Sequence, residues 1–475
     1  MENIKVNTPT VVVVFGARGD LGRRKLFPAF FDLYSKGILP DKFKLLGVSR
    51  AGISKGEFEE VVKNSISEFY KGEARSEKLA GFAGLSDYLC GTFEDFEMYK
   101  KISEELLNMD REFGVCSNKL FYLAVPPKNY ETILKNLDRS GLTIPCSGAE
   151  GWTRVLIEKP FGSDLKTAKS LDRLLGELFH EEQIFRIDHY LAKETIQNIL
   201  TFRFTNTLFE PIWNNKYIEK VEISLFEKLD VSERGGFYDG IGALRDVGQN
   251  HILQILASIA MENPKELNAK NIRAKRAKVL SELKSISKKE MQNSVVKGQY
   301  EGYLDEKGVA EDSKTETYFK LKAFLKNKRW KGVPFILESG KALAESKIEA
   351  KVFFKEKKPC FCAAPHEKHV HQNILTFKIQ PDESIMLQFY VKKPSLTMDY
   401  TEQDLTFKYG GDALGNVMPD AYEKILFDCI VGDQTLFTST KEVMFSWKFI
   451  TAILEVWQNE EPKIYQKGSE GPDAS

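Results

Sequence analysis

The sequence lacks an excess of charge of either sign, because 68 lysines and arginines balance 68 aspartates and glutamates over 475 residues. No net field therefore favours nucleic acid or an anionic membrane, and any anion must be bound by a local group of residues. The chain also lacks an apolar run of the roughly 18 residues that a membrane-spanning helix needs and an N-terminal basic and apolar leader. We therefore expect a cytoplasmic chain with no nucleic-acid partner and no membrane segment.

Cysteine and histidine are scarce, with six residues of each. The cysteines are scattered, and a chain of this length needs no disulfide framework, so a reducing compartment fits best. A Cys-x-Cys pair at residues 360–362 precedes three histidines within residues 366–371, which are residue types that bind metals. The flanking stretches 351–354 and 374–379 have the pattern of strands joined by a loop. We predict no metal site.

The first half of the sequence alternates strand-like and helix-like segments. Thr10–Phe15 is a continuous, largely β-branched run, as expected for a strand buried on both faces of a parallel sheet. Further predicted strands cover residues 43–48, 119–124 and 155–157, and predicted helices begin near residue 22 and cover 93–109 and 128–139. This alternation predicts a doubly wound, Rossmann-like α/β domain.

A glycine turn follows the first strand, with Gly16, Gly19 and Gly22 in the spacing G-x-x-G-x-x-G. Unsatisfied amides and the positive end of the helix dipole at such a turn bind diphosphates. The spacing differs from the usual dinucleotide fingerprint, so a simple strand-to-helix turn remains an alternative. The next strand ends at Arg50 rather than at an acid, which suits the 2′-phosphate of NADP. NADP is the predicted cofactor, with NAD use left open.

The pattern changes after residue 186. Residues 217–226 and 347–354 alternate as strands, 374–379 and 385–391 resemble a hairpin, and no second strand–helix series appears. We expect an α+β C-terminal domain with a large, mostly antiparallel sheet. The predicted division is 1–185 for the NADP-binding domain and 186–475 for substrate binding and oligomerisation.

The densest group of reactive side chains lies in the nine residues Arg186–Glu194, which include Asp188, His189, Tyr190 and Lys193. Histidine, tyrosine and lysine all donate hydrogen bonds to phosphate oxygens, and such charge-assisted bonds are each worth roughly 1.5–3 kcal/mol. A solvated helix start is an equal alternative, because acids near a helix N-terminus are common.

His251 falls on an apolar stripe with Leu244, Val247, Ile255 and Ile259. The residues alone favour a core histidine satisfied by one hydrogen bond. The alternative is a general base that apolar surroundings keep neutral at neutral pH and that a carboxylate orients.

Several blocks of the sequence resemble those of the glucose-6-phosphate dehydrogenase family, in the family's order. Arg186–Glu194 is similar to the family's R-I-D-H-Y-L-G-K-E, with Ala192 in place of glycine. Arg18 also departs, because the family has serine or threonine there. The resemblance covers about residues 10 to 460, and its other blocks lie at residues 16–28, 120–127, 158–162, 234–254, 297–300, 329–335 and 420–423.

The resemblance implies NADP-dependent oxidation of glucose 6-phosphate at C1 to 6-phosphogluconolactone, the first step of the oxidative pentose phosphate pathway. It implies that His251 is the catalytic base and that Asp188 is its carboxylate partner. The residues that it implies for substrate binding are Lys25, Lys159, His189, Tyr190, Lys193, Glu227, Asp239 and Lys341. Those that it implies for cofactor binding are Gly16, Arg18, Gly19, Asp20, Leu21, Arg50, Tyr122 and Lys159. It also implies a homodimer or homotetramer formed through the second sheet.

Two competing functions follow from the same residues. Glu158-Lys159-Pro160, in which the peptide before proline can be cis, also marks oxidoreductases of unphosphorylated sugars related to glucose–fructose oxidoreductase. Such an enzyme has no use for His189, Tyr190 and Lys193 together. A catalytically silent cofactor sensor is the second alternative, and the presence of Asp188 and His251 opposes it.

Four further expectations concern single residues and the two lysine-rich or terminal stretches. The lysine-rich residues 265–289 are predicted to form a solvated helical face. Residues 467–475 are predicted to be a frayed end. Ser346 stands where the family often has a cation, so Lys347 is the alternative contact. Glu338 and Gln388 replace cations that hold a second, structural NADP in some members, so we expect only the catalytic cofactor site.

Overall fold

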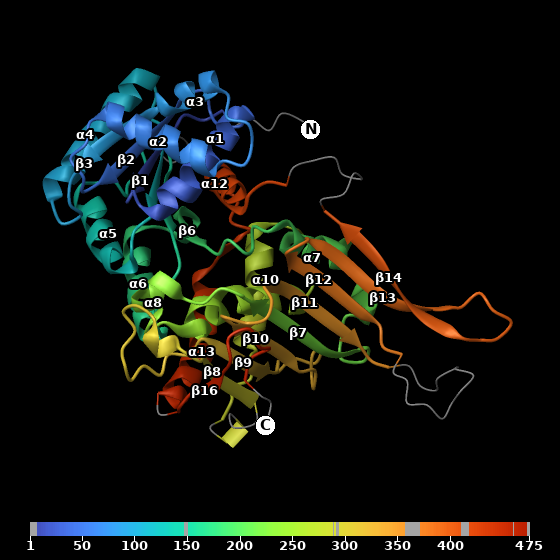
Figure 1. The fold of residues 1–475 in the computed structure, drawn as a ribbon. Helices are drawn as coiled ribbons and strands as arrows, with labels where there is room; N and C mark the ends of the chain where they lie inside the picture. The colour runs from blue at the N-terminus through green and yellow to red at the C-terminus, as the bar shows by residue number, and fades with distance from the viewer. Residues whose placement is uncertain are drawn as a thin grey trace. The chain divides into compact units, whose positions relative to one another are not determined.

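The computed structural model describes residues 7–146, 151–287, 289–290, 294–356, 371–409, 418–458 and 460–472. The chain forms two compact units (Figure 1). The first is drawn from residues 1–162, 166–192 and 419–440, and the second from residues 163–165, 193–418 and 441–475. The first unit is therefore completed by a segment from near the end of the chain.

A seven-stranded sheet forms the core of the first unit, in the order β15-β6-β5-β4-β1-β2-β3. The strands are β1 (Thr10–Phe15), β2 (Phe43–Ser49), β3 (Ser86–Cys90), β4 (Asn118–Leu123), β5 (Thr153–Ile157), β6 (Ile184–Ile187) and β15 (Phe437–Thr438). All neighbours are parallel except the edge strand β15, which pairs antiparallel with β6. The order reverses between β1 and β4, which is the switch point where doubly wound sheets bind nucleotides. The predicted Rossmann-like fold is confirmed.

The helices of the first unit begin and end at local signals. They are a π-helical turn (Gly22–Leu26), α1 (Phe27–Ser35), α2 (Lys55–Phe69), α3 (Ser76–Ala83), α4 (Phe96–Phe113), α5 (Tyr130–Arg139), most of α6 (Leu165–Leu178) and α12 (Ala421–Val431). Ser54 and Glu57 form a capping box at the start of α2. Asp95 caps α4, and Gly114 ends it in the left-handed conformation.

A nine-stranded sheet forms the core of the second unit, in the order β14-β13-β12-β11-β7-β10-β9-β8-β16 (Figure 1). The strands are β7 (Ile218–Phe226), β8 (Val295–Tyr300), β9 (Tyr318–Ala323), β10 (Phe335–Gly340), β11 (Lys347–Phe354), β12 (Ile374–Gln380), β13 (Ser384–Lys392), β14 (Tyr400–Lys408) and β16 (Lys463–Tyr465). Only the pairs β7–β10 and β8–β16 are parallel. The predicted large, mostly antiparallel sheet is confirmed.

The helices of the second unit include one that is buried on all sides. They are α7 (Glu194–Thr205), α8 (Gly235–Tyr238), a π-helix (Leu244–Ile252), α9 (Leu253–Ala260), α10 (Ala269–Ser281) and α13 (Thr440–Trp457). Every residue of α9 is buried, as its apolar sequence dictates. The π-helix packs against β7 and β10 and runs directly into α9.

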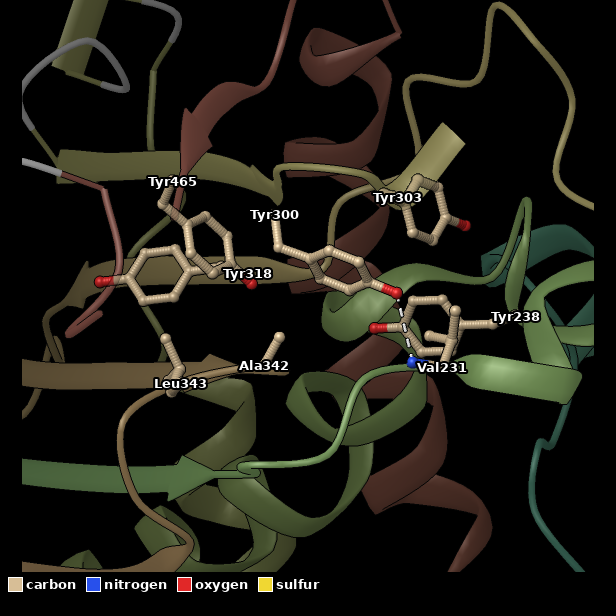
Figure 2. Packing of buried hydrophobic residues seen from close by; sticks show 8 residues of the cluster. All are labelled: Val231, Tyr238, Tyr300, Tyr303, Tyr318, Ala342, Leu343 and Tyr465. Atoms are coloured by element: carbon tan, nitrogen blue, oxygen red, sulfur yellow. Dashed lines mark hydrogen bonds between the residues drawn. The ribbon is translucent and has the colours of Figure 1, made fainter. Parts of the chain in front are cut away.

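A cluster of buried side chains in the second unit is rich in tyrosine (Figure 2). Its buried members are Val231, Tyr238, Tyr300, Tyr303, Tyr318, Ala342, Leu343 and Tyr465. The Tyr300 hydroxyl accepts a hydrogen bond from the Val231 amide (3.2 Å), and the Tyr465 hydroxyl donates to the Lys341 carbonyl (2.7 Å). The cluster thereby fixes the backbone of Lys341.

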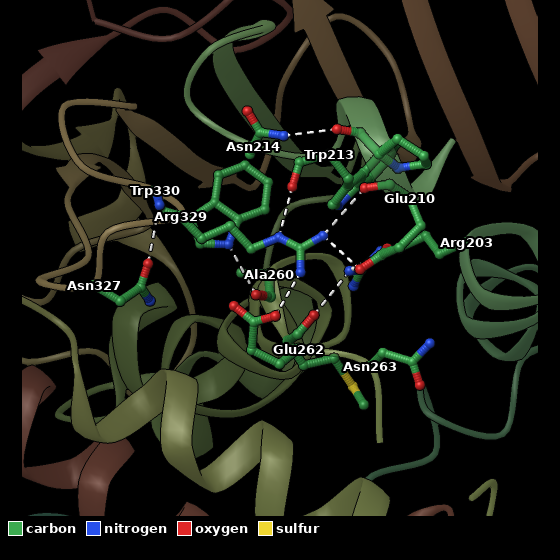
Figure 3. A network of polar contacts seen from close by, with 12 residues as sticks. Arg203, Glu210, Trp213, Asn214, Ala260, Glu262, Asn263, Asn327, Arg329 and Trp330 are labelled. Atoms are coloured by element: carbon green, nitrogen blue, oxygen red, sulfur yellow. Dashed lines mark hydrogen bonds and ion pairs between the residues drawn. The ribbon is translucent and has the colours of Figure 1, made fainter. Parts of the chain in front are cut away.

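A buried polar network ties α7 to the end of α9 (Figure 3). The fully buried Arg203 donates to the carbonyls of Ser258 (3.2 Å) and Met261 (2.8 Å) and pairs with Glu210 (3.1 Å). Arg329 bridges Glu210 to Glu262 (2.6 Å). Because a buried charge is costly unless it is paired and hydrogen-bonded, these contacts specify one arrangement of the segments.

Three expectations about the chain are corrected. Cys116 and Cys146 form a disulfide, because they lie in the loops that lead into the neighbouring strands β4 and β5. The stretch 265–289 is not wholly solvated, since Arg273 and Arg276 are buried and Arg276 pairs with Glu442 (2.8 Å).

The expected fraying is also wrong for residues 467–472. Lys467 pairs with Asp230 (2.7 Å) and Glu306 (3.2 Å), and Ser469 bridges to Leu343. The Cys-x-Cys pair at 360–362 and the histidines at 366 and 369 lie outside the described residues.

Candidate active site

A cleft of about 580 Å³ opens at the carboxyl ends of β1, β2 and β4. It is lined by Gly16, Arg18, Gly19, Ser49, Arg50, Ala51, Phe93, Glu94, Ala124, Val125, Pro126, Lys128 and Asn129. Gly16 has φ +80°, and a Cβ there would lie 2.4 Å from the Ala124 carbonyl oxygen, so only glycine fits between the two strand ends. The space and the glycine turn suit a dinucleotide at the switch point.

The structure separates the cofactor residues expected from the sequence into two groups. Gly16, Arg18, Gly19 and Arg50 line the cleft. Asp20, Leu21, Tyr122 and Lys159 are not among its described lining residues. Asp20 is exposed beside Arg24 (3.6 Å), and Leu21 is half-buried. Tyr122 is fully buried and donates to Glu158 (2.6 Å).

Sequence reasoning missed Lys128 and Asn129 as lining residues. Both follow the carboxyl end of a parallel strand, where such sheets bind their ligands, and this position in the sequence could have identified them. Lys128 adds a third cation to a wall that already carries Arg18 and Arg50.

A carboxyl group surrounded by tyrosines precedes Lys159. The Tyr122 and Tyr422 hydroxyls donate to the Glu158 carboxyl at 2.6 and 3.3 Å, and the Tyr130 hydroxyl donates to its carbonyl (2.9 Å). Burial raises the pKa of Glu158, although the two hydroxyls and Lys159 oppose the shift. The Lys159–Pro160 peptide is cis. Tyr422, in the first turn of α12, is a neighbour that the sequence did not predict.

The block 186–192 follows β6 in the first unit. Arg186 is buried and pairs with Asp172 and Glu181 (both 2.9 Å), so its role is to anchor the strand. Asp188 is buried and accepts a hydrogen bond from the Tyr190 amide (3.1 Å). The His189 ring stacks on Tyr422 with 6.1 Å between centroids. Residues 188–192 therefore form a turn after β6 in which His189 and Tyr190 are half-buried, and the helix starts only at Glu194.

Lys25 and Lys193 occupy different settings. Lys25 lies exposed in the π-helical turn after the glycines, in the first unit. Lys193 occupies the N-cap position at the start of α7 in the second unit.

His251 is buried, 1% exposed, near the end of the π-helix. Its amide donates to the Asn250 side chain (2.6 Å), and neighbouring Gln249 donates to Ser446 (2.8 Å). The predicted helix is present and all five residues of the apolar stripe are buried, but residues 244–252 form a π-helix, which has more residues per turn than the α-helix expected there. Asp188 and His251 belong to different units, and their pairing stays a prediction.

Glu227 and Lys341 form an ion pair at the ends of two parallel strands. Phe226 of β7 lies opposite Gly340 of β10, so the next residue of each strand projects from the same edge. The Lys341 ammonium also lies 5.2 Å from the centre of the Tyr238 ring. The pairing of strands distant in sequence thus creates this acid–base pair.

Asp239 accepts hydrogen bonds from Ser313, Thr315 (2.8 Å), Tyr303 (3.1 Å) and the Ala310 amide (3.2 Å). Burial acts to raise its pKa, but these bonds outweigh it and lower the pKa below the usual value. Asp239 therefore organises the loop that contains these four donors.

Residues 346 and 347 contact acids and backbone of their own unit. The Ser346 hydroxyl accepts from the Lys228 amide (2.8 Å). Lys347 pairs with Glu345 (2.5 Å) and Glu349 (3.7 Å).

A parallel nucleotide-binding sheet followed by a large antiparallel sheet, with a glycine-turn cleft in the first unit, defines a two-domain, nicotinamide-dependent oxidoreductase. Residues 13–198 match the family described as "Glucose-6-phosphate dehydrogenase, NAD binding domain". Residues 200–475 match "Glucose-6-phosphate dehydrogenase, C-terminal domain". The chain belongs to the glucose-6-phosphate dehydrogenase family.

Individual relatives agree over nearly the whole chain. It is 38% identical to glucose-6-phosphate 1-dehydrogenase 2 of Mycobacterium tuberculosis (strain ATCC 25618 / H37Rv) over 482 residues, covering 99% of this chain and 93% of the relative. It is 38% identical to the enzyme of Chlamydia pneumoniae, covering 98% and 93%.

Two solved structures are also similar. A glucose-6-phosphate dehydrogenase in complex with its substrate glucose-6-phosphate has a TM-score of 0.90 at 32% identity, covering 99% of this chain and 96% of that chain. The Mycobacterium avium enzyme has a TM-score of 0.84 at 30% identity, covering 99% and 96%. The predicted NADP-dependent glucose-6-phosphate dehydrogenase activity is confirmed. Among the described helices, none is long and apolar enough to cross a membrane.

Proposed function

We propose that this chain oxidises the C1 hydroxyl of glucose 6-phosphate with His251 as the general base. A ring nitrogen of His251 takes the hydroxyl proton as the C1–O bond becomes a carbonyl. NADP supplies the chemistry of hydride acceptance at C4 of its nicotinamide. The observation that carries the assignment is the burial of His251, which is 1% exposed, because a general base works from a fixed position shielded from bulk water and histidine is the side chain that most often serves as one.

Asp188 orients the imidazole and stabilises the imidazolium in this proposal. Its own position supports such a role, since it is a buried carboxylate held by the turn that follows β6.

The substrate phosphate is assigned to His189, Tyr190 and Lys193, with Lys25 and Lys159 aligning sugar and cofactor. Each of these side chains donates hydrogen bonds, and three of them carry a full positive charge.

The sugar hydroxyls are assigned to Glu227, Lys341 and Asp239. The Glu227–Lys341 pair offers both an acceptor and a donor at the end of β7 and β10, which suits a hydroxyl that donates and accepts. Asp239 already serves four donors of its own loop, so its contact with the sugar needs a remaining acceptor position.

The cofactor is assigned to Gly16, Arg18, Gly19, Asp20, Leu21, Arg50, Tyr122 and Lys159. Gly16, Arg18, Gly19 and Arg50 line the cleft, which supports their assignment most directly. We also propose that residues 1–185 form the cofactor domain, and that residues 186–475 bind the substrate and form the oligomer in the cytoplasm.

A homodimer or homotetramer is proposed through the second sheet. Strand β14 is an edge of that sheet and exposes Leu405 (60%) and Phe407 (40%). Exposed apolar edge strands promote association. Light scattering coupled to gel filtration tests this proposal, and a monomeric mass at micromolar concentration would refute it.

An absorbance assay of NADPH formation tests the function directly. Glucose 6-phosphate and glucose are compared, each with NADP and with NAD. Fast reduction with the phosphorylated sugar alone is expected. Equal rates with glucose would move the assignment to an oxidoreductase of unphosphorylated sugars, and no reduction with either sugar would identify a silent cofactor sensor.

A further inference from the structure

The N-terminus of the π-helix that carries His251 is closed by one buried acid, Glu316. Its carboxylate accepts a hydrogen bond from the amide of Leu244, the first residue of the helix (3.1 Å). Its carbonyl accepts from the amide of Ala243 immediately before (2.9 Å). Glu316 is 4% exposed and lies just before β9. Two amides that a helix start leaves unsatisfied are thus met by a single residue from a distant part of the chain.

The surrounding backbone is shaped around this carboxylate. Gly242 has φ +75°, and a Cβ there would lie 2.3 Å from a carboxylate oxygen of Glu316. Only glycine therefore allows the acid to reach the helix start. A negative group at this end also interacts favourably with the helix dipole.

Two charged neighbours act against the effect of burial on the pKa of Glu316. Burial raises the pKa of Glu316, while Arg245 and Lys297 act in the opposite direction. Both cations bond elsewhere, Arg245 to the carbonyls of Ser163 and Ile241 (both 3.1 Å) and Lys297 to that of Trp457 (3.1 Å). The carboxylate is thus held chiefly by backbone amides.

We propose that Glu316 is a positioning residue for the reaction: by anchoring the start of the π-helix it sets the position of His251, seven residues further on. The inference rests on His251 being the base, as proposed above. π-helical backbone is rare, and the first amides of a helix have no partner within it, so its first turn depends on an external anchor. A displacement of about 1 Å at a catalytic group can cost roughly 10²-fold in rate.

Two conservative variants separate geometry from charge. Glu316→Gln keeps an acceptor oxygen at the same reach and removes the charge. Glu316→Asp keeps the charge and is one methylene too short to reach the Leu244 amide. The matched control is Glu349→Gln, which changes a buried acid of the same unit on β11 that pairs with Lys351 (2.9 Å). His251→Asn is measured in parallel.

The readouts are kcat, the Michaelis constant for glucose 6-phosphate and the isotope effect with substrate deuterated at C1. We expect Glu316→Asp to lower kcat about tenfold with a Michaelis constant within about twofold, and to raise the isotope effect, because a misplaced base slows the chemical step. Glu316→Gln is expected to retain at least about a third of wild-type kcat.

Other outcomes are decisive as well. Wild-type kcat in Glu316→Asp, or a loss that follows only the folded fraction, would reduce Glu316 to a stabilising cap. A loss in Glu316→Gln with normal Glu316→Asp would show that charge matters and geometry does not, which overturns the proposal. Full activity of His251→Asn would instead refute the function on which it rests.

Discussion

At the scale of single residues, His251 combines deep burial with a hydrogen-bonded segment. Its amide donates to the Asn250 side chain (2.6 Å), and the side chain of Gln249, two residues before it, donates to Ser446 (2.8 Å). The ring is shielded from solvent, and hydrogen-bonded side chains fix the segment that carries it, as a general base requires.

His251→Asn is expected to lower kcat by about 10²–10⁴-fold, the usual contribution of a general base, with near-normal substrate binding. Steady-state kinetics check this, with the exposed His180→Asn as control. A variant that kept a tenth of wild-type turnover would contradict the assignment.

Arg50 stands at the rim of the cofactor cleft, in a turn fixed by the Tyr88 hydroxyl, which donates to the Ala51 carbonyl (2.5 Å). Arg50→Ala is expected to raise the Michaelis constant for NADP by roughly tenfold or more and to leave that for NAD unchanged. A charge-assisted bond to the 2′-phosphate is worth about 1.5–3 kcal/mol, and NAD has no such group.

Cofactor kinetics with NADP and NAD measure this effect. The exposed Arg75→Ala, at the start of α3, is the control. Equal losses with both cofactors would remove Arg50 from the 2′-phosphate site.

At the scale of elements, the carboxyl groups of Asp32 on α1 and Glu423 on α12 form a pair that joins the two helices. Lys36 bonds to Asp32 (2.6 Å) and to Glu423 (2.5 Å), and the Tyr70 hydroxyl donates to Asp32 (2.7 Å). Burial and the hydrogen bond with Asp32 raise the pKa of Glu423 from 4.5 to about 7, while the pKa of Asp32 is lowered. The pair therefore holds one proton in the folded state at mildly acidic pH.

Between pH 4.5 and about 7 the folded state binds more protons at Glu423 than the unfolded state does. This contribution to stability is fully present below the unfolded pKa and is lost as pH rises through the folded pKa. The free energy of unfolding should therefore fall from pH 5 to about 7.5 more steeply in the wild type than in Glu423→Gln.

Urea denaturation at several pH values measures the slope. The control is Glu131→Gln, which alters an exposed pair with Lys135 on α5. Identical slopes in the wild type and Glu423→Gln would show that Glu423 titrates normally.

Elements with a clear alternation or apolar run could be predicted, whereas others, including the 18-residue helix α13 and the nine-residue strand β14, could not. The strand at 347–354 and the hairpin at 374–392 have clear alternation and were located within a residue or two. Strands β3 and β14 carry no such pattern, because β3 is mostly half-buried and β14 is largely exposed along its length. The π-helix at residues 244–252 was predicted as an α-helix, because apolar residues repeat on one buried face in both kinds of helix.

At the scale of the whole molecule, the number of cofactor sites follows from two departures from the family. Glu338 already accepts from the Tyr318 hydroxyl (2.5 Å) and pairs with Lys320 (3.2 Å). Its negative charge on β10 opposes a second dinucleotide phosphate. Equilibrium titration is expected to give one NADP per chain, and two per chain would refute the prediction.

The sequence by itself determined the fold class, the family and the residue types of the site. These features depend on which residues follow one another along the chain. A β-branched strand that runs into glycines, or a block such as Arg186–Glu194, can be identified without knowing which residues are in contact. Tertiary structure alone decided which distant residues meet. It brought residues 419–440 back to the first unit, Tyr422 to Glu158, Cys146 to Cys116 and Glu316 to the helix of His251. Such contacts depend on how sheets and helices pack, and pairing between residues far apart in sequence leaves no periodic signal in one chain.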